Sequence, residues 1–291
     1  MEFVNAKTII QTVKGNHSWF GASYNMNIYR GCNQGCIYCD SRSSCYQVNN
    51  FDTIKVKKNA PFIIENELSR KQKTGIISMG SMSDPYNECE TELLYTRKAL
   101  GSVLKYNFGV FIITKNILVL RDIEILKEIN KKNVVNVAIT ITTANDTLQS
   151  RIERNVSSTS SRFNALRELS EAGLFTGILL MPLLPFINDT EENIVSIIEM
   201  AHKANVKYIY PSFGVTLRDN QRDYFFEKIG PSLMEKYISE FKDSYMCTST
   251  NHKELKSIFI SKCKEYGILY NMKDIIEESK KYINEEQLSL F

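Results

Sequence analysis

The feature that most constrains the fold is an alternation of short apolar segments with amphipathic ones between residues 24 and 213. The apolar segments have strand length, and apolar residues recur at helical spacing in the segments between them. The strand-like segments are 24–28, 75–81, 108–115, 134–143, 177–185 and 206–213, and the helical ones are 93–106, 121–132, 160–173 and 192–205. Strands that alternate with helices form parallel sheets with right-handed crossovers. We therefore predict an α/β fold, a partial (β/α)6 TIM-type barrel with its chemistry at the C-terminal ends of the strands.

The pattern divides the chain of 291 residues into four parts. Residues 1–23 form an N-terminal segment, and residues 24–221 form the barrel core. Residues 222–283 show helical spacing and no strand pattern, which predicts a helical C-terminal extension packed against the barrel. Residues 284–291 are expected to be a flexible tail.

Composition sets limits on compartment and partners. Apolar residues make up 43% and charged residues 24% of the chain, which is ordinary for a soluble protein. The net charge of +3 is too small to indicate nucleic-acid binding. No stretch reaches the roughly 18 apolar residues of a membrane span, and the N-terminal MEFVNAKTII does not resemble a signal peptide. We expect a cytoplasmic protein without a membrane partner. In that compartment the clustered cysteines among its seven indicate metal or redox chemistry more than disulfides.

Three of the cysteines are clustered in GCNQGCIYCD, residues 31–40. Cys32, Cys36 and Cys39 are spaced as C-x3-C-x2-C directly after a predicted strand. A four-iron cubane normally takes four cysteine thiolates, so three ligands leave one iron open for a further ligand. Tyr38 would place an aromatic ring beside such a cluster or its ligand.

A structural zinc site is the main alternative for these cysteines. It requires a fourth ligand, which Cys45 or His17 could supply.

The segment NIYRGCNQGCIYCD, residues 27–40, resembles the cluster loop of the radical S-adenosylmethionine (SAM) superfamily. The resemblance implies a [4Fe-4S] cluster on Cys32, Cys36 and Cys39 and SAM as a second cofactor. In that family the reduced cluster cleaves SAM to methionine and a 5′-deoxyadenosyl radical, which abstracts a hydrogen atom from the substrate. An electron donor of the flavodoxin or ferredoxin type is then also implied.

Further segments resemble the spore photoproduct lyase-like branch of that family. They are GSMSDPYNECE (80–90), ITKN (113–116), TITTANDTLQSRIERNVSSTSSRFNALRELSEAG (140–173) and MPLLPFIND (181–189). The positions that match within the last two segments are Thr142, Thr143, Asp146, Glu153, Arg162, Pro182, Pro185, Asn188 and Asp189. Each segment lies at the C-terminal end of a predicted strand. Together with the cysteine loop, the resemblance covers nearly the whole chain.

Polar residues after the second and third strands are expected to bind the methionine end of SAM. Ser81, Ser83 and Asp84 are candidates for its ammonium group, and Lys115 is the candidate for its carboxylate. Ser83 and Asp84 could equally begin a turn or a helix.

Residues after the fourth strand are expected near the ribose of SAM. Thr140, Thr142 and Glu153 are candidates for its hydroxyls, and Arg162 for a carboxylate, either that of SAM or that of Glu153. Glu153 and Arg162 could instead form a structural ion pair.

The chain departs from the lyases at one position. The lyases have a hydrogen-donating cysteine just upstream of the aspartate matched by Asp84, whereas this chain has Ser81 and Met82 there. Cys89 is the candidate catalytic hydrogen donor if its loop folds back; the alternative is a buried, inert thiol.

The last five residues, QLSLF, are similar to the pentapeptide by which bacterial repair and replication proteins bind the β sliding clamp. Gln287, Leu288, Leu290 and Phe291 are the candidate clamp-binding residues. The alternative is a frayed helix end that packs on its own domain.

A basic stretch offers little direct evidence of nucleic-acid binding. It consists of Lys55, Lys57, Lys58, Arg70, Lys71 and Lys73. Because Glu65 and Glu67 are interleaved with these residues, a solvated face is expected.

The leading hypothesis is a lyase-like radical SAM enzyme that repairs or modifies DNA, with DNA and the clamp as candidate partners. One alternative is radical modification of a protein or a small molecule. Another is a non-catalytic iron–sulfur sensor or electron carrier.

Overall fold

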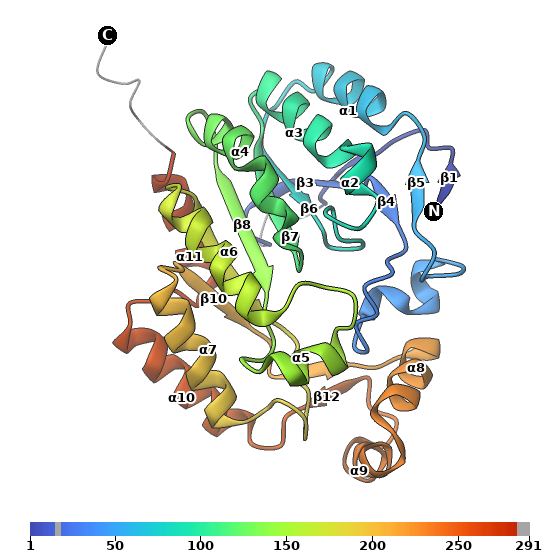
Figure 1. Cartoon of the computed structure of the whole chain (residues 1–291), viewed down its shortest axis with the longest axis vertical. Coiled ribbons are helices and arrows are strands. Elements are labelled where there is room, and N and C mark those ends of the chain that lie inside the picture. Colours follow the sequence, from blue (N-terminus) through green and yellow to red (C-terminus); the bar gives the residue numbers. More distant parts are fainter. Residues whose placement is uncertain (15–18, 284–291) are drawn as a thin grey trace.

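The computed structural model describes residues 1–14 and 19–283, and its centre is a curved sheet of parallel strands (Figure 1). The strand order is β10-β9-β8-β7-β6-β3-β2, and the strands from β3 to β10 are mutually parallel. Their bounds are β3 (Ala22–Met26), β6 (Ile76–Met79), β7 (Gly109–Thr114), β8 (Val135–Thr140), β9 (Phe175–Leu180) and β10 (Tyr208–Pro211). β10 and β2 remain edges of this sheet within the described residues. The predicted partial (β/α)6 barrel is therefore confirmed.

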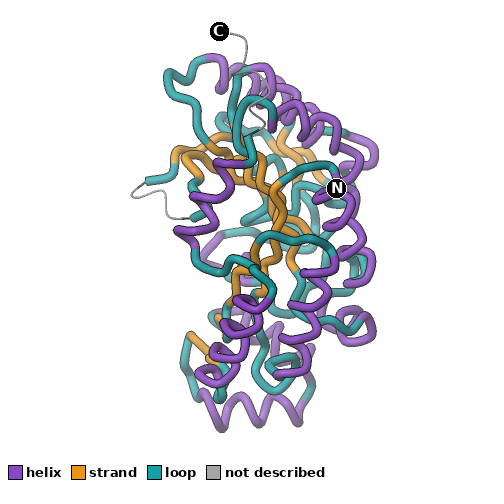
Figure 2. The backbone as a smooth tube through the Cα atoms, turned by 90° about the vertical axis from the view of Figure 1, so that its left-hand side faces the viewer, coloured by secondary structure: helices purple, strands orange, loops and turns teal. Residues whose placement is uncertain are grey.

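The helices between the strands follow one another along the outside of the sheet, as Figures 1 and 2 show. They are α1 (Ala60–Ser69), α3 (Tyr95–Lys105), α4 (Ile123–Asn130), α6 (Thr159–Glu171) and α7 (Glu191–Lys203), with the shorter α2 (Glu90–Leu93) and α5 (Asp146–Ile152) in the connecting loops. Their buried residues recur at helical spacing, for example Ala99, Leu100 and Val103 in α3. No helix within the described ranges is long and apolar enough to cross a membrane.

An aromatic cluster fills one end of the barrel interior. Phe20 stacks on Phe111 with ring centroids 4.3 Å apart, and Phe175 stacks on Tyr208 at 5.4 Å. Gly177 allows the Tyr208 ring to approach, because a Cβ at residue 177 would lie 2.0 Å from that ring. This end of the barrel is a packed core, which leaves the C-terminal ends of the strands for a site.

Both flanking segments contain short strands that the sequence pattern did not predict. The segment 1–23 contains β1 (Glu2–Val4) and β2 (Ile10–Thr12), and β2 extends the barrel sheet antiparallel to β3. The extension also contains a strand, β12 (Met246–Thr248), which pairs antiparallel with β11 (Gly214–Thr216). Strands of three residues are too short to show a period of two, and their partners are distant in sequence.

The remaining elements pack against the barrel. They are the short strands β4 (Tyr29–Arg30) and β5 (Lys55–Lys57), the 3-10 helices η1 (Asp40–Arg42), η2 (Ser44–Tyr46) and η3 (Ile117–Asp122), and the C-terminal helices α8 (Asp219–Ile229), α9 (Pro231–Phe241), α10 (His252–Glu265) and α11 (Met272–Lys281). α10 packs on α7, and the Ile209 N–H in β10 donates to the Leu269 carbonyl at 2.9 Å.

Candidate active site

The three clustered cysteines line one open cavity of about 520 Å3. Its other walls come from residues 80–84 after β6 and 113–115 at the end of β7. The structure therefore brings Cys32, Cys36 and Cys39 together at the C-terminal ends of two barrel strands, where they face a space that could hold a cofactor.

The segment after α5 holds the cysteine loop in place. The Ile37 N–H donates to the Ile152 carbonyl at 3.0 Å, and the Asn155 N–H donates to the Gln34 carbonyl at 3.0 Å. The Asn155 side-chain amide also donates to the Asn33 carbonyl at 2.7 Å. These bonds fix a loop that has little secondary structure of its own.

The C-terminal extension holds the other flank of the loop. Arg218 donates to the Asp40 carboxylate at 2.5 Å, and Ser43 Oγ donates to Asp219 at 3.0 Å. The Arg42 guanidinium lines the cavity and lies over the Tyr224 ring, 3.8 Å from its centroid. Contacts between residues this far apart in sequence leave no local pattern, and sequence reasoning missed them.

The thiols occupy a buried environment. Burial raises the pKa of Cys32 to about 12 and also raises the pKa of Cys36 and of Cys39 above the usual thiol value. Ligand-free thiols are therefore protonated at neutral pH, and binding a metal cluster releases their protons.

Lys115 brings a buried positive charge to these thiols. Burial by itself acts to lower its pKa, but Cys36 and the carboxylates of Glu153 and Asp84 outweigh burial, so the net pKa is raised. Lys115 lines the cavity as expected, and its charge suits a carboxylate or an anionic cluster.

The Asp84 carboxylate connects three elements of the site. Gln34 Nε2 and the Lys115 N–H donate to one of its oxygens, at 2.7 and 2.8 Å. Thr114 Oγ1 and the Tyr86 N–H donate to the other, at 2.7 and 2.8 Å. Four donors occupy the carboxylate, so Asp84 fixes the cysteine loop to the ends of β6 and β7. The structure supports its interpretation as a turn residue, although Asp84 also lines the cavity.

Two serines remain for a ligand. Ser81 and Ser83 both line the cavity. Ser83 Oγ is buried and has no hydrogen-bond partner among the described residues. Because an unpaired buried hydroxyl is costly, a bound polar group is expected to satisfy it.

The residues expected at the ribose lie behind the cysteine loop and do not line the described cavity. The Tyr38 hydroxyl donates to Glu153, and Arg162 Nη1 lies 2.6 Å from Glu153 Oε2, with both of the paired side chains fully buried. Arg162 Nη1 also donates to the Thr140 carbonyl at 2.9 Å, and Thr142 Oγ1 lies 3.5 Å from Glu153. The structure thus supports the ion-pair alternative, because the opposite charges of Glu153 and Arg162 lie in contact in a fully buried environment.

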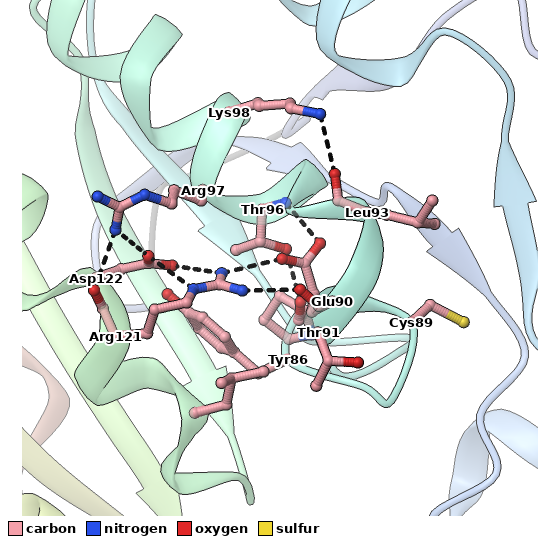
Figure 3. A network of polar contacts seen from close by, with 12 residues as sticks. Tyr86, Cys89, Glu90, Thr91, Leu93, Thr96, Arg97, Lys98, Arg121 and Asp122 are labelled. Carbon is pink, nitrogen blue, oxygen red and sulfur yellow. Dashed lines mark hydrogen bonds and ion pairs between the residues drawn. The ribbon is translucent and has the colours of Figure 1, made fainter.

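Cys89 does not reach the cavity. It lies before α2 in the hydrophobic core with 5% of its surface exposed, and burial raises its pKa. In Figure 3 its sulfur points away from a network in which Arg121 pairs with the buried carboxylates of Glu90 and Asp122, at 3.0 and 2.8 Å. This network holds the loop after β6, and the position of Cys89 supports the alternative of a buried thiol.

The zinc alternative finds no support among the described residues. Cys45 is exposed and lies outside the lining of the cavity, and His17 lies outside the described residues. No three His, Cys, Asp or Glu side chains in the described ranges are arranged around a single ion. A cubane differs because each of its cysteines binds a different iron, so the thiols need not converge on one point. The residues present fit a cluster with three cysteine ligands.

Two solved structures with a similar fold contain bound S-adenosylmethionine (AdoMet). A spore photoproduct lyase mutant with bound AdoMet and dinucleoside spore photoproduct is similar over 92% of this chain and 81% of its own, with a TM-score of 0.67 and 12% identity. SuiB of Streptococcus suis bound to S-adenosylmethionine is similar over 85% of this chain and 48% of its own, with a TM-score of 0.53 and 11% identity. At these identities the similarity shows the fold.

Two sequence relatives are described as uncharacterized proteins. A protein of Mycobacterium tuberculosis is 25% identical over 224 residues, which is 74% of this chain and 66% of the relative. A protein of Methanocaldococcus jannaschii is 33% identical over 174 residues, 59% of this chain and 64% of the relative. The chain thus spans just under two thirds of their length. The family model described as "Radical SAM superfamily" matches residues 26–198, which include the cysteine loop and the strands that line the cavity. The chain belongs to the radical SAM superfamily.

Proposed function

We propose that this protein is a radical SAM enzyme that reductively cleaves S-adenosylmethionine and uses the resulting radical to repair or modify DNA. The observation that carries the proposal is the single cavity shared by Cys32, Cys36, Cys39 and Lys115. Three thiols can hold a cluster with one open iron, and the lysine beside them suits the carboxylate of an amino-acid cofactor.

When bound, the cluster would supply the electron that cleaves SAM. The residues of this chain have three tasks. The cysteine thiolates hold the cluster, Lys115 stabilises negative charge next to it, and Ser83 Oγ offers a hydrogen bond to a polar group of the cofactor. Asp84 keeps the loop and the two strand ends in register.

Two observations support DNA as the substrate. The similarly folded spore photoproduct lyase binds a dinucleoside photoproduct. The pentapeptide with Gln287, Leu288, Leu290 and Phe291 resembles a sliding-clamp ligand, although it lies outside the described residues. Recruitment by the clamp would bring a protein of small net charge to DNA.

The geometry does not favour photoproduct reversal itself. Ser81 and Met82 occupy the position that holds a cysteine in the resembling lyases, and Cys89 lies in the core rather than in the cavity. A different DNA lesion or a DNA modification is the better hypothesis.

A reductant must reach the cluster from outside, and we propose a flavodoxin- or ferredoxin-type protein with an acidic surface. Ile37, between two cysteine ligands, lines an open groove of about 1,030 Å3 on the surface. Arg151, Arg154 and Lys228 line the same groove without an acidic residue. In the described part of the chain, Lys228 pairs with Glu227 at 2.7 Å and Arg154 also acts on that carboxylate, whereas Arg151 makes no ion pair. Three cations against one neighbouring carboxylate leave the groove positive, which would attract an acidic partner.

The test is anaerobic. The protein is reconstituted with iron and sulfide, reduced with dithionite and given SAM, and 5′-deoxyadenosine is measured with and without single- and double-stranded DNA. We expect 5′-deoxyadenosine, and more of it when DNA is present. Formation without any response to DNA would favour a protein or small-molecule substrate. No cleavage by a verified, reduced cluster would favour a sensor or an electron carrier.

A further inference from the structure

A second cavity, of about 620 Å3, adjoins the cysteine cavity. The two share Met82 and Ser83 as a common wall, so the second cavity lies directly beside the proposed SAM site. Its charged lining residues are Arg30 and Lys57, and no acidic residue lines it. A cleft with two cations and no carboxylate concentrates positive potential and attracts an anion.

Lys57 lacks a partner for its charge. Its side chain is half-buried in β5, and no hydrogen bond or ion pair involves its ammonium group within the described residues. The Glu67 carboxylate raises the pKa of Lys57 by less than Arg30 lowers it, and it already accepts hydrogen bonds from the Ile9 and Ile10 N–H groups, at 3.1 and 2.9 Å. Burial, and then the neighbouring charge of Arg30, lower the pKa of Lys57. A bound anion would offset both effects, because an opposite charge stabilises the protonated ammonium group.

The cavity offers further hydrogen-bond donors on three side chains. The Arg30 guanidinium donates to the carbonyls of Tyr46 and Gln47, at 3.2 and 2.7 Å, which fixes its charge at the cavity. The side-chain amides of Gln11 and Asn27 line the cavity, and neither has a hydrogen-bond partner in the parts of the chain that are described. Two cations with two amides match the several acceptor oxygens of a phosphate group.

We propose that Arg30, Lys57, Gln11 and Asn27 form a phosphate-binding subsite for the substrate of the neighbouring cavity. The proposal rests on the proposed function and extends it, since it assigns the substrate a phosphate group that binds beside the cysteine cavity. Both a DNA backbone and a free nucleotide carry this group. It also corrects the expectation for the basic stretch: Lys58 is exposed on the surface, whereas Lys57 lines a cavity.

The test measures binding by the full-length protein and needs no turnover. The anisotropy of a fluorescein-labelled single-stranded oligonucleotide is titrated at several salt concentrations for wild type, Lys57→Met, Lys57→Arg and the control Lys58→Met. Loss of one phosphate contact should reduce the salt slope of log K by about 0.7. We expect this loss in Lys57→Met, and retention of the slope in Lys57→Arg and Lys58→Met. Equal slopes in wild type and Lys57→Met would overturn the proposal, as would equal losses in Lys57→Met and Lys58→Met.

Competition by thymidine monophosphate distinguishes the two sources of phosphate. If the mononucleotide displaces the oligonucleotide from wild type but not from Lys57→Met, the subsite takes a single phosphate and a free nucleotide suffices. If only a longer oligonucleotide competes, the subsite takes a backbone phosphate. Both results support the subsite. Failure of the proposed function can be distinguished from failure of the subsite. If the salt slope of the wild type depends on Lys57 but the protein forms no 5′-deoxyadenosine, the subsite is retained and the proposed enzymatic activity is refuted.

Discussion

Replacing Arg162 with methionine tests whether the buried pair with Glu153 is structural. The two side chains are fully buried and 2.6 Å apart, and Arg162 also donates to the Thr140 carbonyl. Removing one partner of a buried ion pair leaves an uncompensated charge and costs roughly 3–5 kcal/mol. For a chain of 291 residues, we expect the melting temperature of the cluster-free protein to fall by about 5–8 °C.

The matched control is Arg167→Met on the same helix, α6. Arg167 is exposed and its Nε lies 4.0 Å from Glu171, so its loss should change the free energy of unfolding by less than about 0.5 kcal/mol. The double variant Arg162→Met/Glu153→Gln removes both buried charges. It should regain at least about 1 kcal/mol over Arg162→Met alone.

The assays are thermal denaturation, for the melting temperature, and urea denaturation, for the free energy of unfolding. Both are followed by circular dichroism on the cluster-free protein under reducing conditions. If Arg162→Met and Arg167→Met are equally stable, Arg162 does not act through a structural pair. In that case the earlier alternative, in which Arg162 binds a carboxylate of SAM, would regain support.

The remaining predictions concern the cavity wall, the groove and the tail. Gly80 has a φ of +98°, and a Cβ there would lie 2.0 Å from a backbone carbonyl oxygen, so Gly80→Ala should destabilise the protein and weaken SAM binding measured by equilibrium dialysis. Gly101→Ala, in α3 with open space around it, should stabilise the protein by about 0.5–1 kcal/mol in the same urea assay, and the reverse order would contradict the backbone argument. Arg151→Glu/Arg154→Glu should slow 5′-deoxyadenosine formation about 10-fold or more with a flavodoxin-type reductant but not with dithionite. An equal loss with both reductants would argue against a docking groove. Phe291→Ala should weaken binding to the β sliding clamp by at least about 10-fold in surface plasmon resonance, and an unchanged affinity would remove the clamp hypothesis.

The sequence predicts those strands of the fold that are buried along their whole length. β7, β8 and β9 have nearly every residue buried, so they form long apolar runs that a sequence reveals. β12 spans three residues and depends on β11, which is distant in the chain. The pairing that defines it is therefore invisible to a local pattern.

In the site, too, local features could be predicted from the sequence, and features that depend on distant residues could not. The spacing of the cysteines is local, and it identified the loop that lines the cavity. The occupancy of Asp84 depends on donors from three separate elements, so the sequence could name the residue but could not choose between a ligand role and a turn role. Glu153 and Arg162 posed the same choice, and only their distance decided it.

The lining of the second cavity was missed because its members come from β2, the loop after β3, β4 and β5, and no motif joins them. Lys57 differs from its neighbour Lys58 only in burial, which a run of lysines in a sequence does not show.

The central claim is that Cys32, Cys36 and Cys39 hold a cluster whose open iron faces the cavity. The most direct test is electron paramagnetic resonance of the anaerobically reconstituted, dithionite-reduced protein, recorded before and after addition of SAM, together with iron and sulfide analysis. The account predicts iron and sulfide that match one [4Fe-4S] cluster per chain and a spectrum that changes when SAM is added. It also predicts that both the cluster and the change are lost in Cys36→Ala. A cluster that persists in Cys36→Ala, or a wild-type spectrum that SAM leaves unchanged, would contradict it.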